Sequence, residues 1–342
     1  MSRTTIADVA KVAGVSKATV SRVLSGNYEY MKPDTRTSVQ DAIEKLGYRP
    51  SSVARSLTSN RTNTTAILVS DVGNPFYADV IHGVEDEAFK GHYDIFLCNT
   101  NYDLDRGLAF IRSLVDKRVD GVMIMSSSMS DLWLAELSKS NVPAVVLDWE
   151  VKAAGADVST IGVDYSVGIQ AAVNHLISLG HQHLAHISGP LHLQTARDRR
   201  NAFLSAIAKH GIPVEAAPVI EGDLQIAGGR QAIDQLMGLS PRPTAVFTAN
   251  DMTAIGLIAA ARAHGLVVPH DLSVIGLDDI WLAEQSDPPL TTVGLPRYQI
   301  GQLAMQMLFD LLDTGKERPS TPVRRQVETS LVVRQTTAPV PE

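Results

Sequence analysis

The sequence predicts an α/β protein: a small all-helical unit at the N-terminus, followed by two doubly wound α/β subdomains. Three features predict this fold. Apolar residues recur at helical spacing over residues 1–49, the polar run SNRTNT near residue 60 is typical of a linker, and short apolar runs then alternate with amphipathic stretches. We therefore expect a helical domain at 1–49, a connecting segment at 50–64 and an α/β domain at 65–342.

The first residues predict two short helices joined by a tight turn. Their apolar positions follow i, i+3, i+4, i+7 spacing and are Ile6, Val9, Ala10 and Ala13, then Val20, Val23 and Leu24. Thr5 and Asp8 form a capping-box pattern, and Ser16 is a suitable N-cap for the second helix. Gly14 permits the turn between them. A third helix is predicted from Pro33 to the stop at Gly47.

This spacing is typical of a helix-turn-helix, whose second helix enters the major groove of DNA with its first residues against base edges. Lys17, Ala18 and Arg22 occupy outward positions on that helix and are expected to read base sequence. Small hydroxyl side chains suited to phosphate contacts lie beside them: Ser16, Thr19 and Ser21. On periodicity alone, a helical hairpin in a protein-interaction domain is the alternative.

The distribution of charge favours the DNA-binding interpretation. The whole chain has a net charge of −7, but residues 1–61 carry 10 basic and 5 acidic side chains, a net +5, which leaves −12 for the remainder. A small basic module on an acidic body attracts phosphates locally and limits nonspecific adhesion.

The composition also argues against several classes of protein. The N-terminus lacks an apolar signal-peptide core, and no apolar run reaches the roughly 18 residues of a membrane span, so we expect a cytoplasmic protein without membrane contact. Cys98 is the single cysteine, which rules out an intramolecular disulfide and a cysteine-based zinc site.

Two long stretches carry a resemblance to a known family. TIADVAKVAGVSKATVSRVLSG and the later KPDTR and AIEKLGYRPSSVARSL resemble the N-terminal signature of the lac repressor family. The resemblance implies contacts of Thr5 and Ala54 with DNA, and a hinge helix over residues 52–56 that orders on operator DNA. It also implies that Leu57, paired with its mate in a homodimer, wedges into the minor groove and kinks the duplex.

The α/β part resembles the periplasmic-binding-protein core that this family joins to its DNA-binding unit. The ribose- and purine-repressor branch is the most similar, through NPFY, LCNT, KRVDG, LDW and RPTAVFTAND. We expect an N-terminal subdomain of residues 65–161 and 293–323, and a C-terminal subdomain of 162–291 and 324–340. Ligands of such a core bind in the cleft beyond the carboxyl ends of the strands.

Candidate effector-binding residues all follow predicted strands or open a helix: Asn74, Phe76, Tyr77, Asp148, Trp149, Arg197, Asn250 and Asp278. Aromatic rings suit the C–H face of a sugar, and carboxylate, amide and guanidinium groups bind its hydroxyls. The resemblance favours Asp148, Arg197 and Asp278 most strongly. The sequence therefore predicts a sugar-like effector.

Two positions depart from ribose-binding relatives. Leu295 stands where a polar glutamine is usual, and Leu224 stands where an aromatic ring is usual. These residues suit an effector with a less polar edge, such as a deoxy or methylated sugar or a different pentose. A purine or phosphorylated effector remains an alternative, which the acidic pair Asp148 and Asp278 disfavours.

No pattern predicts an enzyme, a cofactor or a metal site. His183 and His186 span a helix-to-strand junction near His181, and no nearby carboxylate completes a zinc site. No nucleophile-base constellation is visible. We expect a homodimeric repressor of carbohydrate genes. A cytoplasmic sugar-binding protein without a DNA-binding role and a sugar enzyme on the same scaffold are the rival classes.

Overall fold

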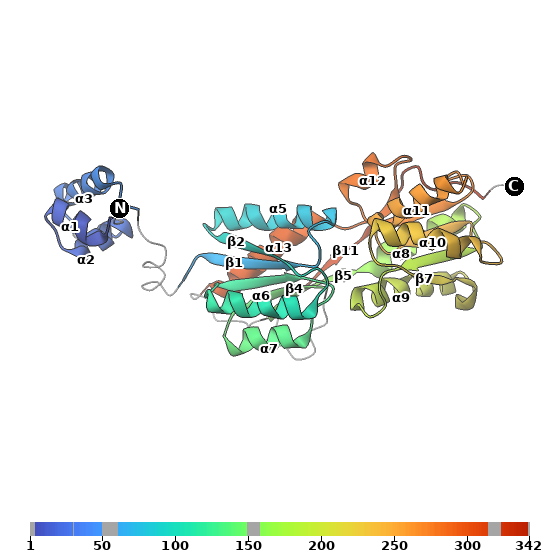
Figure 1. Ribbon diagram of the computed structural model, residues 1–342, viewed down its shortest axis with the longest axis horizontal. Helices are drawn as coiled ribbons and strands as arrows, with labels where there is room; N and C mark the ends of the chain where they lie inside the picture. Colours follow the sequence, from blue (N-terminus) through green and yellow to red (C-terminus); the bar gives the residue numbers. More distant parts are fainter. Residues whose placement is uncertain (1–3, 30, 50–60, 149–157, 314–322, 341–342) are drawn as a thin grey trace. The chain divides into compact units, whose positions relative to one another are not determined.

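The computed structural model describes residues 4–29, 31–49, 61–148, 158–313 and 323–340 (Figure 1). The chain forms two compact units that divide between Asn63 and Thr64. Within the described ranges, no helix is long and apolar enough to cross a membrane.

The smaller unit is a bundle of three helices, α1 (Ile6–Ala13), α2 (Lys17–Leu24) and α3 (Pro33–Leu46). Thr5 and Asp8 form the capping box at the start of α1, and Ser16 caps α2 by accepting from the backbone of Thr19. Gly14 ends α1 in the left-handed region, with φ 68°. The helices share one apolar core, made of Val9, Ala10, Val20, Val23, Val39 and Ala42.

The larger unit contains two mainly parallel sheets. The first has the strand order β11-β5-β4-β3-β1-β2, and the second has the order β12-β10-β9-β8-β6-β7. The strands of the first sheet are β1 (Thr64–Val69), β2 (Asp94–Asn99), β3 (Gly121–Met125), β4 (Ala144–Leu147), β5 (Val158–Asp164) and β11 (Arg324–Glu328). Those of the second are β6 (Leu184–Ser188), β7 (Val219–Glu221), β8 (Ala245–Thr248), β9 (Ser273–Asp278), β10 (Thr291–Gly294) and β12 (Ser330–Val332).

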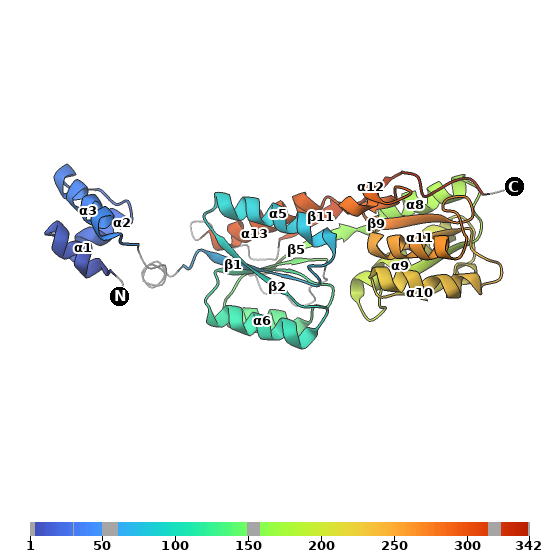
Figure 2. The same ribbon diagram turned by 45° about the horizontal axis from the view of Figure 1, so that its top comes forward.

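Helices cover both faces of each sheet (Figures 1 and 2). The first sheet packs against α5 (Pro75–Lys90) and α13 (Arg297–Leu312) on one face, and against α6 (Leu104–Asp116) and α7 (Asp131–Lys139) on the other. The second packs against α8 (Tyr165–Ser178) and α9 (Gln194–Lys209), and against α10 (Ile226–Met237) and α11 (Asp251–Ala263). A short 3₁₀ helix, η1 (Val214–Ala216), and α12 (Trp281–Gln285) complete the unit.

The chain passes between the two sheets three times. β5 leads into α8, β10 leads into α13, and β11 leads into β12. The predicted last passage, between residues 323 and 324, is wrong, because β11 pairs with β5 in register from Arg324↔Thr160 to Glu328↔Asp164. The passage therefore lies at Thr329, because backbone pairing keeps these polar residues in the first sheet.

Two glycines set the distance between α5 and α13. A Cβ on Gly301 would overlap the carbonyl oxygen of Val80, and one on Gly83 would overlap that of Tyr298. The two helix backbones can touch only because both positions lack a side chain.

We expect Gly301→Ala to destabilise the protein by about 1–3 kcal/mol, because the new methyl group overpacks this contact. In a helix, alanine is normally more favourable than glycine by about 1 kcal/mol. The expected change in stability therefore has the opposite sign to the one that helix propensity alone predicts. Gly238→Ala is the control, since its Cβ would meet ordinary contacts of 3.6 Å. Urea unfolding curves measure both, and equal midpoints for the two variants would contradict the prediction.

Candidate functional site

The helix-turn-helix presents a polar surface along α2. Lys17, Ala18, Ser21 and Arg22 are exposed, whereas Val20 and Val23 are buried against α1 and α3. The outward positions predicted to read bases are therefore free of the bundle core.

Helix capping involves three of the other predicted DNA contacts, namely Thr5, Ser16 and Thr19. The hydroxyl of Thr5 donates to Asp8 Oδ2 at 2.7 Å, and Ser16 Oγ lies 3.0 Å from Thr19 Oγ1. A DNA phosphate only accepts hydrogen bonds, so Thr5 can contact one only by turning its single hydroxyl proton away from Asp8, whereas Ser16 and Thr19 use only one of their two hydroxyl protons between them. Ala54 and Leu57 lie outside the described residues.

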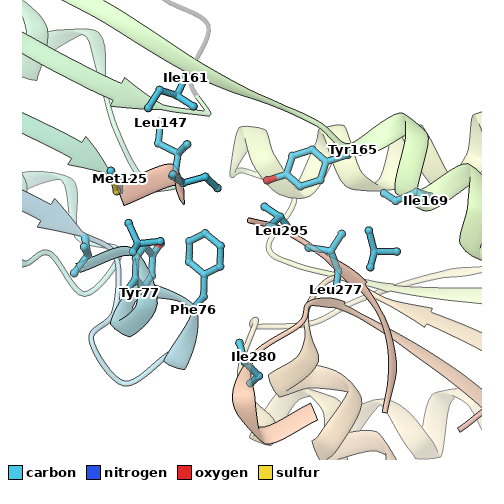
Figure 3. Close-up of a cluster of buried hydrophobic side chains, with 14 of the residues drawn as sticks. Phe76, Tyr77, Met125, Leu147, Ile161, Tyr165, Ile169, Leu277, Ile280 and Leu295 are labelled. Carbon is cyan, nitrogen blue, oxygen red and sulfur yellow. The ribbon is translucent and has the colours of Figure 1, made fainter. Parts of the chain in front are cut away.

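A pocket lies where the two sheets of the larger unit meet, at the carboxyl ends of their strands. The residues around it are Asn74, Phe76, Tyr77, Tyr102, Met125, Ser126, Ser127, Leu147, Asp148, Thr195, Arg199, Leu224, Asn250 and Asp278. Figure 3 shows its apolar side, with Phe76, Tyr77 and Leu147 from the first sheet's layer and the hydroxyl end of Tyr165 directed toward them. Six of the eight predicted effector-binding residues meet here.

Arg199 lies at the centre of the polar part of the pocket. Its Nη1 donates to the carbonyl of Ala249 at 2.8 Å, and its Nη2 donates to the hydroxyl of Tyr165 at 3.0 Å. The Tyr165 hydroxyl in turn donates to Asp148 Oδ2 at 2.6 Å. A second carboxylate, that of Asp278, has its Oδ1 3.9 Å from Arg199 Nη2. One cation therefore faces two carboxylates from different sheets.

Burial shifts the proton affinities of these groups. It raises the pKa of Asp278 to about 6, although Arg199 and Arg297 act in the opposite direction. It also raises the pKa of Asp148, against the hydrogen bond from Tyr165. Burial opposes the charge on Arg199, but Tyr165 and the two carboxylates hold its pKa above the ordinary value. The guanidinium therefore stays charged.

Two polar atoms of this network have no hydrogen-bond partner among the described residues. They are Asp278 Oδ1, an acceptor, and Arg199 Nε, a donor, and both are buried. The 3.9 Å separation between Asp278 and Arg199 is too long for a hydrogen bond. Because unpaired buried polar groups cost about 1–3 kcal/mol each, such a pair is typical of a site that binds a polar ligand.

Two predicted effector-binding residues, Arg197 and Trp149, are not among the residues around the pocket. Arg197 turns back along the chain, where its guanidinium donates to the carbonyls of Leu191 and His192 and to Gln194. Trp149 lies outside the described residues. Of the two departures noted in the sequence, Leu224 lines the pocket, whereas Leu295 lies in the adjoining apolar core.

Arg199 is not among the residues predicted from the sequence, although the sequence contains a signal for it. The buried face of α9 contains Ala196, Phe203 and Ile207, which follow helical spacing. Arg199 falls on the same face, three residues after Ala196, whereas Arg197 does not. Helical periodicity therefore distinguishes the two arginines. Tyr102 was also missed, because nothing in its local sequence indicates a cleft position.

The two asparagines of the pocket act partly as helix caps. Asn74 accepts from the backbone of Phe76 at the start of α5, and Asn250 accepts from that of Thr253 at the start of α11. The Asn250 amide also donates to the carbonyl of Leu224 at 2.9 Å. Their local role is to hold the strand-end loops in place.

Several pocket residues have unusual backbone conformations. Asp148, Leu224 and Tyr102 have φ values of 55°, 64° and 58°, and Asp278 has 117°. Such conformations are unfavourable for side chains with a Cβ and persist where the surrounding structure imposes them, often at binding sites.

Comparisons with known proteins agree with this architecture. Residues 5–51 match the family "Bacterial regulatory proteins, lacI family", and residues 173–337 match a periplasmic binding protein-like domain. The HTH-type transcriptional repressor PurR of Aliivibrio fischeri (strain MJ11) is 38% identical over 92% of this chain and 94% of the relative.

Two solved structures are similar over most of their length. The lac repressor dimer bound to operator and the anti-inducer ONPF has a TM-score of 0.85 at 28% identity, covering 98% of this chain and all of that one. A lacI-family regulator from Enterococcus faecium with bound ribose has a TM-score of 0.74 at 29% identity, covering 81% of this chain and all of that one.

A helix-turn-helix joined to a two-sheet domain with a polar pocket defines a DNA-binding transcription regulator controlled by a small molecule. The chain belongs to the lacI family of bacterial regulatory proteins. It is a transcriptional repressor with an effector-binding domain, and not an enzyme.

The raised pKa of Asp278 predicts a pH-dependent contribution to stability. In the folded state its pKa is about 6, against an ordinary value of 3.8, so the folded protein binds the proton more tightly. The favourable contribution is complete below pH 3.8 and is lost as the pH rises through about 6.

We therefore expect the free energy of unfolding of the wild type, relative to Asp278→Asn, to fall by about 1 kcal/mol between about pH 5 and about pH 7. Asparagine is a neutral match in shape and tolerates a positive φ. Urea unfolding at several pH values measures the difference, and a difference that stays constant across this range would contradict the assignment.

Proposed function

We propose that the pocket binds a small sugar or related polyol, and that this effector controls the affinity of a homodimer for operator DNA beside carbohydrate genes. The buried acceptor on Asp278 and the buried donor on Arg199 carry the proposal. A hydroxyl group both donates and accepts, so one hydroxyl, or two neighbouring ones, can satisfy both atoms.

The charges of the pocket favour a neutral effector. Asp148 and Asp278 face a single guanidinium, that of Arg199, so a phosphate ester would meet more negative than positive charge. The rings of Phe76 and Tyr77 offer apolar surface for the C–H face of a sugar. The ribose bound to the regulator from Enterococcus faecium supports this class of ligand.

Leu224 gives one side of the pocket an apolar wall. This supports an effector with a less polar edge than ribose, such as a deoxy or methylated sugar. A purine would meet the two carboxylates with N–H groups in place of hydroxyls, and its binding is one outcome of the test below.

The helix-turn-helix would supply the DNA contacts. We propose that Lys17, Ala18 and Arg22 face base edges, because they are exposed on α2, and that Leu57 acts as the minor-groove wedge. A homodimer would read two half-sites of a pseudo-palindrome.

A second copy of the chain fits the exposed apolar side chains of the larger unit. Phe89 on α5 is 83% exposed, and Phe96 and Leu97 are 43% and 50% exposed on β2, the edge strand of the first sheet. Apolar surface of this kind is typical of an interaction site. The related lac repressor structure is a dimer on its operator.

We expect one sugar from a panel of pentoses, hexoses, deoxy sugars, sugar phosphates and purines to raise the melting temperature of the full chain. At a concentration about 100 times its Kd, it should stabilise the folded state by about 2.7 kcal/mol. Arg199→Gln should weaken its binding by at least about tenfold, because a hydrogen bond to a charged group contributes about 1.5–3 kcal/mol.

Arg197→Gln is the matched control on the same helix and should bind the sugar nearly as well as the wild type, since Arg197 is turned away from the pocket. Stabilisation by a purine or a phosphate ester instead would refute the proposed effector class. Loss of binding in Arg197→Gln but not in Arg199→Gln would refute the assignment of the arginine.

For the DNA contacts, we expect Arg22→Ala to weaken binding to the best duplex selected from a randomised pseudo-palindromic library by about 1–3 kcal/mol per half-site. Binding to an unrelated duplex should change much less. Lys11→Ala, on α1, controls for the loss of a positive charge from the same unit. Fluorescence anisotropy at one salt concentration measures the affinity of the wild type and of both variants for the two duplexes. An equal loss of affinity on both duplexes in Arg22→Ala would show that Arg22 contacts phosphate and does not read bases.

A further inference from the structure

Tyr102 reaches from one subdomain onto the other. It follows β2 of the first sheet, in a turn where Asn101 and Tyr102 both have positive φ, 54° and 58°. Its ring packs against an apolar cluster that belongs to the second sheet's layer, made of Leu193, Ala196, Leu224 and Ala249. The strained turn therefore aims an aromatic side chain across the pocket.

Leu224, on the opposite wall of the pocket, is also held in one position. Leu224 has a φ of 64°, and its carbonyl accepts the hydrogen bond from Asn250. A Cβ on Gly189 would lie 2.6 Å from Leu224 Cδ2, so the leucine side chain occupies space that only a glycine leaves open. Tyr102 and Leu224, on the two sides of the contact, therefore both have backbone conformations that persist only because the surrounding structure imposes them.

A hydrogen bond links the same two segments beside this contact. Gln225, next to Leu224, donates from Nε2 to Asp71 Oδ2 at 3.1 Å. The other oxygen of that carboxylate accepts from the backbone of Gly73 at 2.8 Å, which fixes its orientation. Asp71 follows β1 and Gln225 precedes α10, so this bond also joins the first sheet's side of the pocket to the second's.

The pocket beside these contacts is small. Its cavity has a volume of ≈ 40 Å³, which is room for a few water molecules. Small-molecule pockets are typically about 300–1,000 Å³. A sugar can therefore enter only if one wall moves, and the contact of Tyr102 with the Leu224 cluster is a wall formed between two subdomains.

We propose that Tyr102, together with the Asp71–Gln225 hydrogen bond, forms a clasp that holds the two subdomains together across the effector pocket, and that the ring of Tyr102 becomes the aromatic wall against the bound effector. The role toward an effector rests on the function proposed above, whereas the clasp itself does not. Tyr102 thereby adds a third aromatic ring to those of Phe76 and Tyr77, placed against Leu224 of the opposite subdomain.

Amide hydrogen exchange of the full chain, without effector, tests the clasp. In Tyr102→Ala, exchange should become at least about fivefold faster in residues 222–226 of the second subdomain as well as in 101–103. That factor corresponds to about 1 kcal/mol of lost stability in the closed arrangement. Gln225→Ala should likewise accelerate exchange in residues 71–74, across the pocket.

The matched control is Tyr298→Ala, which removes a tyrosine from the surface of α13 and should leave both cleft segments unchanged. Tyr102→Phe keeps the ring and should exchange like the wild type. Acceleration confined to residues 101–103 in Tyr102→Ala would overturn the proposal, because it would show that the ring covers only its own turn.

The role of Tyr102 toward an effector is tested with the sugar that the panel described above identifies, by measuring its rate of association and its affinity. With a working clasp, the loss of Tyr102 should speed association of the stabilising sugar and weaken its final affinity. Faster exchange in both segments together with no response to any sugar would leave the clasp standing and refute the proposed effector class alone.

Discussion

The larger unit depends on one buried cation. Arg199 comes from the second sheet's layer and donates to the hydroxyl of Tyr165, the first residue of α8, and that hydroxyl in turn donates to Asp148, just after β4 of the first sheet. A guanidinium out of water is tolerated only when hydrogen bonds and opposite charges compensate it. The carboxyl ends of both sheets must therefore converge on Arg199, and their convergence forms the pocket.

Besides the three chain passages, shared packing links the two sheets. The apolar core that contains Phe76 and Val80 of the first sheet's layer continues to Ile169 and Leu277 of the second. Arg297, at the start of α13, adds a link by bonding Asp79 of α5 and the carbonyl of Asp278. Changes in the cleft must take place around these shared elements, because separating them would expose apolar surface and leave charges unpaired.

Much of this organisation could be predicted from the sequence, because it follows from local patterns. The capping box at Thr5 and the glycine stop at Gly47 predicted helix ends that the structure confirms. Apolar runs separated by amphipathic stretches predicted the alternating strands and helices. Strand-end positions brought Asp148, Asn250 and Asp278 to one pocket, since parallel strands place their carboxyl ends at the same edge.

What the sequence could not predict depends on contacts between distant segments. The last passage between the sheets depends on the pairing of β11, a strand of mostly polar residues, with β5. Tyr102 is the clearest case, because its partners lie about 90 or more residues away. Local sequence describes its turn but not what the ring meets.

These contacts have a consequence for regulation. An effector shifts DNA affinity only by its unequal affinity for different arrangements of the cleft, and such couplings are typically about 1–3 kcal/mol. A single aromatic or hydrogen-bonded contact contributes about 0.5–1.5 kcal/mol. The contact of Tyr102 and the bond between Asp71 and Gln225 are therefore of the same magnitude as the whole coupling. A few side chains across the cleft, rather than the bulk of the two sheets, are enough to set how strongly this repressor responds.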